Sequence, residues 1–339
     1  MCSCPACCDL AYFAAMSPII AVLIPCHNEE AAIAKVVRDF RSALPTATVF
    51  VYDNNSTDRT MAVAAEAGAV VRSEPLQGKG NVVRRMFADI EADAYVLVDG
   101  DDTYDADSAP RLINLLLDDN LDLVNGARVA SAQAAYRPGH RFGNALLTGV
   151  VAQVFGNRLT DMLSGYRVFS RRFVKAFPAL SAGFEIETEF TVHALQLRVP
   201  MAELETPYRE RPPGSVSKLH TYSDGARILR TIVKLIKEER PLYFFSIAFA
   251  LLALTSVVLA IPIVQTFMET GTVPRFPTAI LSMGLMLLAF LSLASGLILD
   301  TVTRGRIEMK RLHYLSVPVR SNHVRETSLS SAGRRDAAA

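Results

Sequence analysis

Residues 95–107, YVLVDGDDTYDAD, decide the fold class, because an apolar run ends there in a cluster of acidic residues. Val96, Leu97 and Val98 are typical of a buried strand. The carboxylates that follow would be very costly to bury without partners. Open α/β sheets bind their ligands beyond the carboxyl ends of the strands, so this stretch predicts a ligand site. Its acidic residues are Asp99, Asp101, Asp102, Asp105 and Asp107.

Strand and helix patterns alternate around this stretch. Short apolar runs predict strands at 19–24, 47–53, 69–71, 95–98 and 121–127. Segments with helical spacing of apolar residues lie between them, at 28–44, 61–67, 81–92 and 109–119. Asn28 is the expected N-cap of the first helix, and Asp105 and Asp107 are expected to start the last one. The alternation predicts an α/β fold with a mostly parallel, doubly wound sheet and helices on both faces.

The second half of the sequence is less regular. It predicts a helix at 140–156, a turn and strand at 161–172, a helix at 184–197, a strand at 201–208 and a basic loop at 209–218. Within the first half, Pro25, Asp53 and Asp99 each end a predicted strand. Because the carboxyl ends of parallel strands meet at one edge of a sheet, we expect these residues to converge on one cleft.

Two uncharged stretches, 242–264 and 277–299, are long enough to cross a hydrocarbon core of roughly 30 Å as helices. Basic residues flank the pair, whereas the loop between the stretches carries one basic residue, Arg275. The positive-inside rule places both ends of the pair, and the first 240 residues, in the cytoplasm. The segment 221–240 predicts an amphipathic helix at the membrane surface. Its basic stripe consists of Arg227, Arg230, Lys234 and Lys237.

These patterns divide the chain into five parts. They are an N-terminal extension at 1–16, an α/β domain at 17–220, the amphipathic helix at 221–240, a membrane hairpin at 241–300 and a cytoplasmic, partly disordered tail at 301–339. Four of the five cysteines lie in the extension, where they suit a metal or acyl chains. Met16, directly before the first strand, favours a native start there instead. A formal net charge of +1 argues against nucleic acid as a partner.

The order Asp99-Gly100-Asp101 suits a hard divalent cation. Mg²⁺ or Mn²⁺ takes one or two protein oxygens and completes its shell with phosphate oxygens, so the ligand would be a diphosphate. Other motifs fail. Val83 stands where a dinucleotide fingerprint has its third glycine, and Gly80 follows Lys79 where a P-loop has Ser or Thr. Residues 104 and 110 lack the glycine and glutamate of an EF-hand loop.

Seven motifs occur in a fixed order along the chain. They are IPCHNEE (24–30), VYDNNSTDRT (51–60), QGKG (77–80), VDGDDTY (98–104), NGARV (125–129), DMLSGYRVFSR (161–171) and RERPPGSVSKL (209–219). In this order they resemble the motifs of family 2 glycosyltransferases with the GT-A fold. The set is most similar to that of polyprenyl- or dolichyl-phosphate hexose synthases, some of which carry a two-helix C-terminal membrane anchor. The resemblance covers residues 19–219.

The resemblance implies a role for each matching residue. The implied donor-binding residues are Pro25, His27, Glu29, Asp53, Gly78, Lys79, Asp99, Gly100, Arg128, Arg211 and Lys218. Among these, Asp99 would hold the metal together with Asp101. Arg141 and Arg167 would guide an acceptor phosphate. The implied catalytic residues are Asp101, Asp161 and Arg167.

The chain departs from the family pattern at four points. His27 replaces an aromatic residue but can still stack on a base. Asn54 replaces a second aspartate, and Thr103 stands where some synthases have glutamine. The loop GSVSK has one residue more than the family's G-x-S-K, which weakens the match of Lys218.

The expected reaction is an inverting, metal-dependent transfer of a hexose from a UDP-glucose or GDP-mannose type of donor to a polyprenyl phosphate. A phosphate acceptor needs no general base, since its second pKa lies near 6, and Asp161 would then orient Arg167. The alternative is a lipid-linked saccharide or glycolipid hydroxyl as acceptor, with Asp161 as general base. Both roles of Asp161 stay open at this point, as does self-association of the chain.

Three other classes fit less well. Processive polysaccharide synthases carry a Q-x-x-R-W motif, and this chain has no tryptophan. A nucleotidyltransferase would have a glycine-rich basic loop after its first strand, where this chain has PCHNEE. A non-catalytic membrane scaffold would not need the intact pair Asp99 and Asp101.

Overall fold

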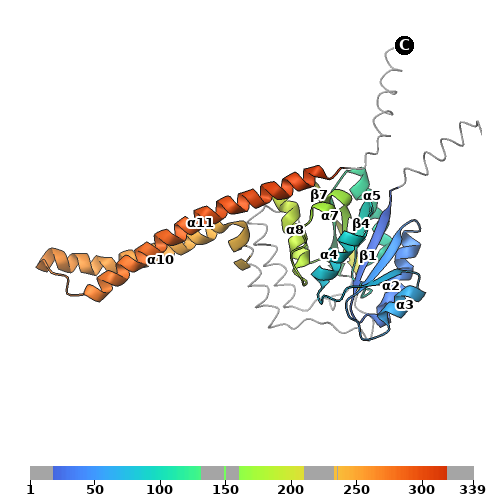
Figure 1. The fold of residues 1–339 in the computed structure, drawn as a ribbon, viewed down its shortest axis with the longest axis horizontal. Helices are drawn as coiled ribbons and strands as arrows, with labels where there is room; N and C mark the ends of the chain where they lie inside the picture. Colours follow the sequence, from blue (N-terminus) through green and yellow to red (C-terminus); the bar gives the residue numbers. More distant parts are fainter. Residues whose placement is uncertain (1–17, 131–148, 150–159, 210–232, 235, 319–339) are drawn as a thin grey trace, which may run out of the picture. The chain divides into compact units, whose positions relative to one another are not determined.

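The computed structural model describes residues 18–130, 149, 160–209, 233–234 and 236–318 of the 339. The described part contains a seven-stranded sheet with the order β3-β2-β1-β4-β6-β5-β7. Figure 1 shows this sheet together with its helices. All neighbouring strands are parallel except β6, which is antiparallel to β4 and β5. The mostly parallel sheet is confirmed. The strands are β1 (Ile20–Cys26), β2 (Thr48–Asp53), β3 (Val70–Ser73), β4 (Ala94–Leu97), β5 (Leu123–Ala130), β6 (Arg167–Ser170) and β7 (Met201–Tyr208).

The position of β6 brings a distant motif to the acidic stretch. Arg167 at the start of β6 pairs with Leu97, the last residue of β4, and with Asn125 of β5. The turn at 161–166 therefore lies beside the point where Asp99 and Asp101 leave the sheet. The sequence predicted both β5 and β6 but not that β6 separates β5 from β4.

Helices cover both faces of the sheet, as expected. Successive residues of β1 alternate between two apolar clusters, with Val22 and Ile24 in one and Ala21 and Leu23 in the other. The first cluster contains buried residues of α2 (Glu30–Ala43), α3 (Thr60–Glu66), the 3₁₀ turn η1 (Ala106–Ser108) and α5 (Ala109–Asp118). The second contains those of α4 (Lys79–Asp89), α7 (Arg171–Ala176) and α8 (Ile186–Leu197).

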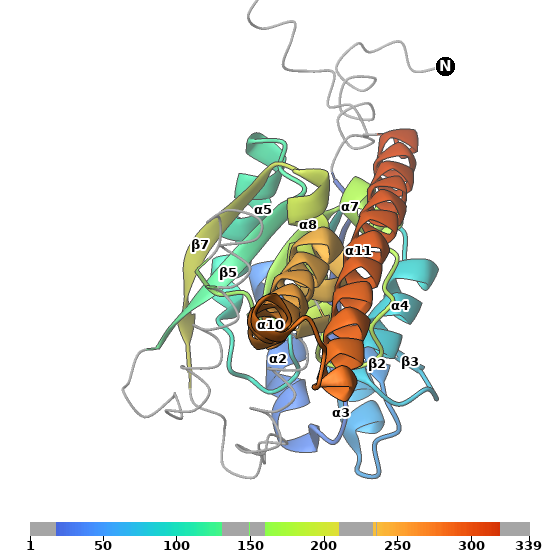
Figure 2. The same cartoon turned by 90° about the vertical axis from the view of Figure 1, so that its left-hand side faces the viewer.

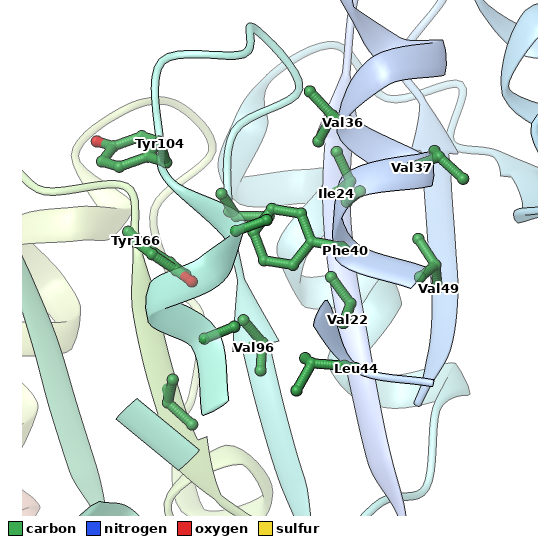
Figure 3. Packing of buried hydrophobic residues seen from close by; sticks show 14 of the residues in the cluster. Val22, Ile24, Val36, Val37, Phe40, Leu44, Val49, Val96, Tyr104 and Tyr166 are labelled. Atoms are coloured by element: carbon green, nitrogen blue, oxygen red, sulfur yellow. The ribbon is translucent and has the colours of Figure 1, made fainter. Parts of the chain in front are cut away.

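The packing of α2 on β1 contributes much of the first apolar cluster. Figure 3 shows Val36 and Phe40 of α2 beside Val22 and Ile24 of β1. The ring of Phe40 also meets Tyr166 edge to face, with 6.0 Å between ring centroids. This contact links the first strand and helix to the turn before β6.

Two local expectations, one about a helix start and one about a strand end, are wrong. Asn28 does not cap α2, because its φ of 54° lies in the left-handed region and its Oδ1 accepts the N–H of Thr57 at 2.7 Å. The N-cap is Glu29, without a side-chain capping bond. The predicted strand over 161–172 ends at Ser170, whose Oγ accepts the N–H of Phe173 and caps α7.

Several predictions lie outside the described residues. They concern the cysteine cluster at 1–16, most of the helix at 140–156, the basic loop at 210–218, the first part of the amphipathic helix with Arg227 and Arg230, and the tail at 319–339.

The chain divides into two compact units. The first contains the sheet with its helices and also residues 313–318. The second contains α10 (Pro241–Thr270) and α11 (Phe276–Ser316) as far as residue 312. Both helices are long and apolar enough to cross a membrane, and they include the predicted spans 242–264 and 277–299.

Small residues form the contact between α10 and α11. The hydroxyls of Ser256 and Ser282 donate to each other's backbone carbonyls, at 2.7 and 2.9 Å. A Cβ atom at Gly296 would stand 2.8 Å from Cβ of Phe245, so the backbones approach closely there. Large apolar side chains point away from this contact, for example Met283 with 73% of its surface exposed.

The tail expected from residue 301 is in fact helical through Ser316. Within the sheet unit, the hydroxyl of Tyr314 donates to Oδ2 of Asp122 at 2.5 Å. The guanidinium of Arg172 lies 5.0 Å from the centre of the Tyr314 ring, and its Nε donates to the carbonyl of Val317 at 3.2 Å. The end of α11 is thus part of the packed sheet unit.

Candidate active site

The carboxylates predicted to converge do gather at the carboxyl end of β1. Cys26, the last residue of this strand, is buried, and burial raises the pKa of its thiol. The negative charges of Glu29, Asp53, Asp99 and Asp101 raise that pKa further. Four carboxylates from three segments therefore lie close enough to this one point at the carboxyl end of β1 to act on the same thiol.

Two loops at this edge are tied together by hydrogen bonds. The N–H of Asn28 donates to Ser56 at 2.8 Å, and the N–H of Glu29 donates to Thr60 at 2.9 Å. These bonds hold the segment with Pro25, His27 and Glu29 against the segment that follows Asp53. The donors are backbone N–H groups and the acceptors are side-chain hydroxyls, so the position of this segment depends on Ser56 and Thr60.

Asp53 has a buried carboxylate oxygen without a hydrogen-bond partner among the described residues. Its side chain is 2% exposed, and Oδ2 accepts the N–H of Ser56 at 3.0 Å. Within the described residues, Oδ1 has no hydrogen-bond partner. A buried carboxylate oxygen is costly to leave unpaired, which fits a donor group of a bound base at this position.

The departure at Asn54 has a structural reason. Its amide nitrogen donates to the carbonyls of Glu74 and Leu76 at 2.9 and 2.8 Å, and its oxygen accepts the N–H of Gly78 at 2.7 Å. An ionised aspartate could not donate the first two bonds. Asn54 thus holds the QGKG loop in place. Gly78 has a φ of 128°, and a Cβ there would lie 2.2 Å from the carbonyl oxygen of Ala182.

Lys79 lies between two carboxylates at the start of α4. Its ammonium is 2.5 Å from Oδ1 of Asp99 and 2.6 Å from Oε1 of Glu187, and its side chain is 7% exposed. Burial lowers the pKa of Lys79, but the two carboxylates outweigh this effect and raise it. Burial raises the pKa of Glu187. Glu187 was not among the residues predicted for the site, because FEIETEF contains three glutamates and its local pattern does not single out this one.

Asp99 and Asp101 differ in their surroundings. The side chain of Asp99 is 28% exposed and packs on Gly165, where a Cβ would lie 2.3 Å from its Oδ2. Asp101 is 4% exposed, and its Oδ1 accepts the Thr103 hydroxyl at 2.6 Å. Gly100 lets the chain pass Cys26, because a Cβ there would lie 2.6 Å from the sulfur.

The two aspartates fit a metal that is shared with a ligand. Within the described residues, no group of three His, Cys, Asp or Glu side chains could enclose an ion by itself. Mg²⁺ needs only one or two carboxylates when substrate phosphates and water supply the other oxygens. Asp99 and Asp101 would be the residues that hold it.

The acidic residues after Asp101 have separate roles. Asp102 has a φ of 58° and pairs with Lys35 at 2.7 Å. Asp105 accepts the hydroxyl of Ser108 at 2.9 Å and pairs with Arg209 at 2.7 Å. Neither adds an oxygen to the pair of aspartates at the cleft.

Arg128 and Asp161 form a two-pronged ion pair beside the cleft. Nε and Nη2 of Arg128 donate to the two oxygens of Asp161 at 2.7 and 2.8 Å. The guanidinium also lies 5.6 Å from the centre of the Tyr208 ring. This geometry fixes the direction of the remaining guanidinium N–H groups.

Arg167 is placed differently from the expectation. It is 0% exposed, and its nitrogens donate to the carbonyls of Ser164 and Met162 and to the hydroxyl of Thr191. Burial lowers the pKa of its guanidinium. In these contacts Asp161 orients Arg128 rather than Arg167, and Arg167 supports the turn. The remaining expected phosphate ligands, Arg141, Arg211 and Lys218, lie outside the described residues.

A family model described as "Glycosyl transferase family 2" matches residues 21–177. The chain is also 33% identical over 304 residues to the glycosyltransferase AglJ of Haloferax volcanii, which covers 87% of this chain and 98% of the relative. The chain belongs to glycosyl transferase family 2. The glycosyltransferase identity predicted from the ordered motifs is confirmed, and the chain is an enzyme of this class.

Two further comparisons concern another relative and a solved structure. This glycosyltransferase is 28% identical over 221 residues to a dolichyl-phosphate hexose transferase of Haloferax volcanii, over 65% of this chain and 95% of the relative. It is also similar to a crystal structure of Mycobacterium tuberculosis glucosyl-3-phosphoglycerate synthase in complex with Mn²⁺, UDP and its product. The TM-score is 0.53 at 24% identity, covering 66% of this chain and 81% of the other. The likeness confirms the GT-A fold.

Proposed function

We propose that this family 2 glycosyltransferase transfers a hexose from a UDP-glucose or GDP-mannose type of donor to a polyprenyl phosphate. The transfer would take place at the cytoplasmic face of a membrane, to which α10 and α11 anchor the chain. The ion pair of Arg128 and Asp161 carries this proposal. It presents a fixed guanidinium at the cleft, which suits phosphate oxygens.

The same ion pair favours a phosphate acceptor over a hydroxyl acceptor. Both oxygens of Asp161 accept hydrogen bonds from Arg128, so this carboxylate is less available to take a proton from a sugar hydroxyl. A phosphate monoester is largely ionised at neutral pH and needs no general base. The similarity to a dolichyl-phosphate hexose transferase supports this acceptor class.

In the proposed reaction, an acceptor phosphate oxygen attacks the anomeric carbon of the sugar. The bond from that carbon to the donor diphosphate breaks, and its electron pair leaves with the nucleoside diphosphate, which inverts the anomeric centre. Arg128 stabilises the negative charge that develops on the leaving group. A divalent ion held by Asp99 and Asp101 would supply further charge stabilisation, and the Mn²⁺ and UDP in the related synthase structure support such a metal.

One labelling experiment tests donor and acceptor together. Membranes that contain the protein are incubated with radiolabelled UDP-glucose, GDP-mannose or UDP-N-acetylglucosamine, with and without added polyprenyl phosphate. We expect one donor to label a lipid-phosphate monosaccharide, and added acceptor to increase the label. Label found only in longer glycans or glycolipids would contradict the phosphate acceptor and favour a hydroxyl acceptor with Asp161 as base.

The metal-binding carboxylates are tested by Asp101→Ala. We expect this variant to fold and to lose transfer, because Asp101 is one of the two carboxylates proposed to hold the ion. Circular dichroism in detergent checks folding, and the labelling assay checks transfer. Normal activity in the variant would contradict the two-carboxylate site.

A further inference from the structure

The turn that carries Asp161 is held by two side chains from neighbouring strands. Asn125 of β5 and Glu203 of β7 face each other in the parallel register of these strands, which lie side by side at the sheet edge (Figure 2). The amide nitrogen of Asn125 donates to Oε1 of Glu203 at 2.7 Å. It also donates to the backbone carbonyl of Asp161 at 2.8 Å. Asn125 is 0% exposed, so its amide makes these hydrogen bonds in the protein interior, away from solvent.

Glu203 accepts three further hydrogen bonds from the same turn. Its Oε2 accepts the N–H and the hydroxyl of Thr160 at 2.7 and 2.8 Å, and its Oε1 accepts the N–H of Asp161 at 3.1 Å. Together with Asn125, it thus holds both backbone groups of Asp161. The side chain of Asp161 in turn holds the guanidinium of Arg128. A continuous set of hydrogen bonds runs from the edge strand to the cation at the cleft.

We propose that Glu203, with Asn125, is a positioning residue that fixes Asp161 and, through it, Arg128. This inference rests on the proposed function, in which Arg128 stabilises the leaving group. The effect on the reaction is indirect, since Glu203 bonds to the turn and not to Arg128 itself. Tyr208 on the same strand supports the other side of the guanidinium, so β7 contributes twice to its position.

The isosteric variant Glu203→Gln tests this role. Glutamine keeps the size of the side chain but replaces one acceptor oxygen by a donor, which then faces either the Thr160 N–H or the donors of Asn125 and Asp161. We expect kcat to fall by about 10- to 100-fold, because a small misplacement of a catalytic group has effects of this size. The donor KM should change by less than about threefold, since the loss lies mainly in the transition state.

The matched control is Glu205→Gln, which removes the same charge two residues further along the same strand. Glu205 is exposed and forms no hydrogen bond or ion pair with the turn among the described residues. We expect its activity to equal that of the unchanged protein. Equal losses in both variants would show an effect of charge alone and would overturn the proposal.

A double-mutant cycle separates positioning from general support of the fold. In a chain that carries Asp161→Asn, the added change Glu203→Gln should lower kcat by less than about twofold, because residues that act through one another are not additive. Full additivity would overturn the proposal. If Asp161→Asn alone left kcat unchanged, the proposed function of the ion pair would fail instead, so the two failures are distinguishable.

A milder variant covers the case in which Glu203→Gln does not fold. Thr160→Val removes the hydroxyl that donates to Glu203 and leaves the backbone bonds in place. We expect kcat to fall by a smaller factor, with restoration in Thr160→Ser. A loss in Thr160→Val that Thr160→Ser fails to restore would contradict the proposal.

Discussion

Lys79 is the residue on which the charge balance of the cleft depends. Its ammonium neutralises Asp99 and Glu187, which come from different segments. Because these carboxylates raise the pKa of Lys79 above its usual 10.5, its stabilising effect is fully present below that pH. It is lost at alkaline pH, as the pH rises through the pKa of the folded state.

Lys79→Met should destabilise the sheet unit by about 3–5 kcal/mol at neutral pH, because it leaves the buried Glu187 and the partly exposed Asp99 without their cation. The difference should shrink in acid. Glu187 has a pKa raised above 4.5 by burial, so it takes up a proton and becomes neutral before an ordinary glutamate does. Thermal unfolding in detergent at neutral and acidic pH measures both effects. A loss that is equal at the two pH values would contradict the explanation.

Gly165 tests the packing of the Asp99 carboxylate. A Cβ at this position would lie 2.3 Å from Oδ2 of Asp99, so Gly165→Ala must displace the carboxylate. We expect transfer to fall by about 100-fold with the fold retained. Gly305→Ala is the control, because nothing lies within 4 Å of a Cβ there. The labelling assay compares the two variants, and equal activities would show that the Asp99 position is not critical.

At the scale of elements, Tyr314 is one of the contacts between the end of α11 and the rest of the sheet unit. Tyr314→Phe removes the hydrogen bond to Asp122, whose other oxygen accepts the hydroxyl of Ser170 at 2.5 Å. We expect a loss of about 1.5–3 kcal/mol, the usual contribution of a hydrogen bond to a charged group. Amide hydrogen exchange at residues 313–317 should become faster. Leu315→Ala is the control, because this side chain is 63% exposed, and it should leave the exchange rates at these residues unchanged.

At the scale of the whole molecule, the two long apolar helices predict a definite membrane arrangement. We expect the chain to stay in the membrane fraction after a carbonate wash, because α10 and α11 expose large apolar side chains. A cysteine placed at Thr272, in the loop between them, should react with an impermeant maleimide added outside intact cells. Native cysteines are replaced first. Labelling only after lysis would contradict the expected topology.

The sequence predicted the elements because their signals are local. Alternation of apolar runs and helical spacing identified the strands and helices, and the apolar lengths identified α10 and α11. It also placed Asp53, Asp99 and Asp101 at one edge, since parallel strands end on the same side. The prediction of Asn28 as an N-cap is wrong because its side-chain oxygen accepts a hydrogen bond from the N–H of Thr57, in a loop that is distant in the sequence.

The sequence by itself therefore determined the α/β class, the acidic edge and the glycosyltransferase family. Only the tertiary structure decided which groups pair there. Lys79 pairs with Glu187, which lies 108 positions further along the chain. Asp161 pairs with Arg128, whereas Arg167, which is closer to Asp161 in the sequence, is buried in the turn. The turn that carries Asp161 directly precedes β6, which lies between β4 and β5, and this position brings Asp161 to Arg128 of β5. Local spacing carries no information about such strand order, because order results from packing between distant segments.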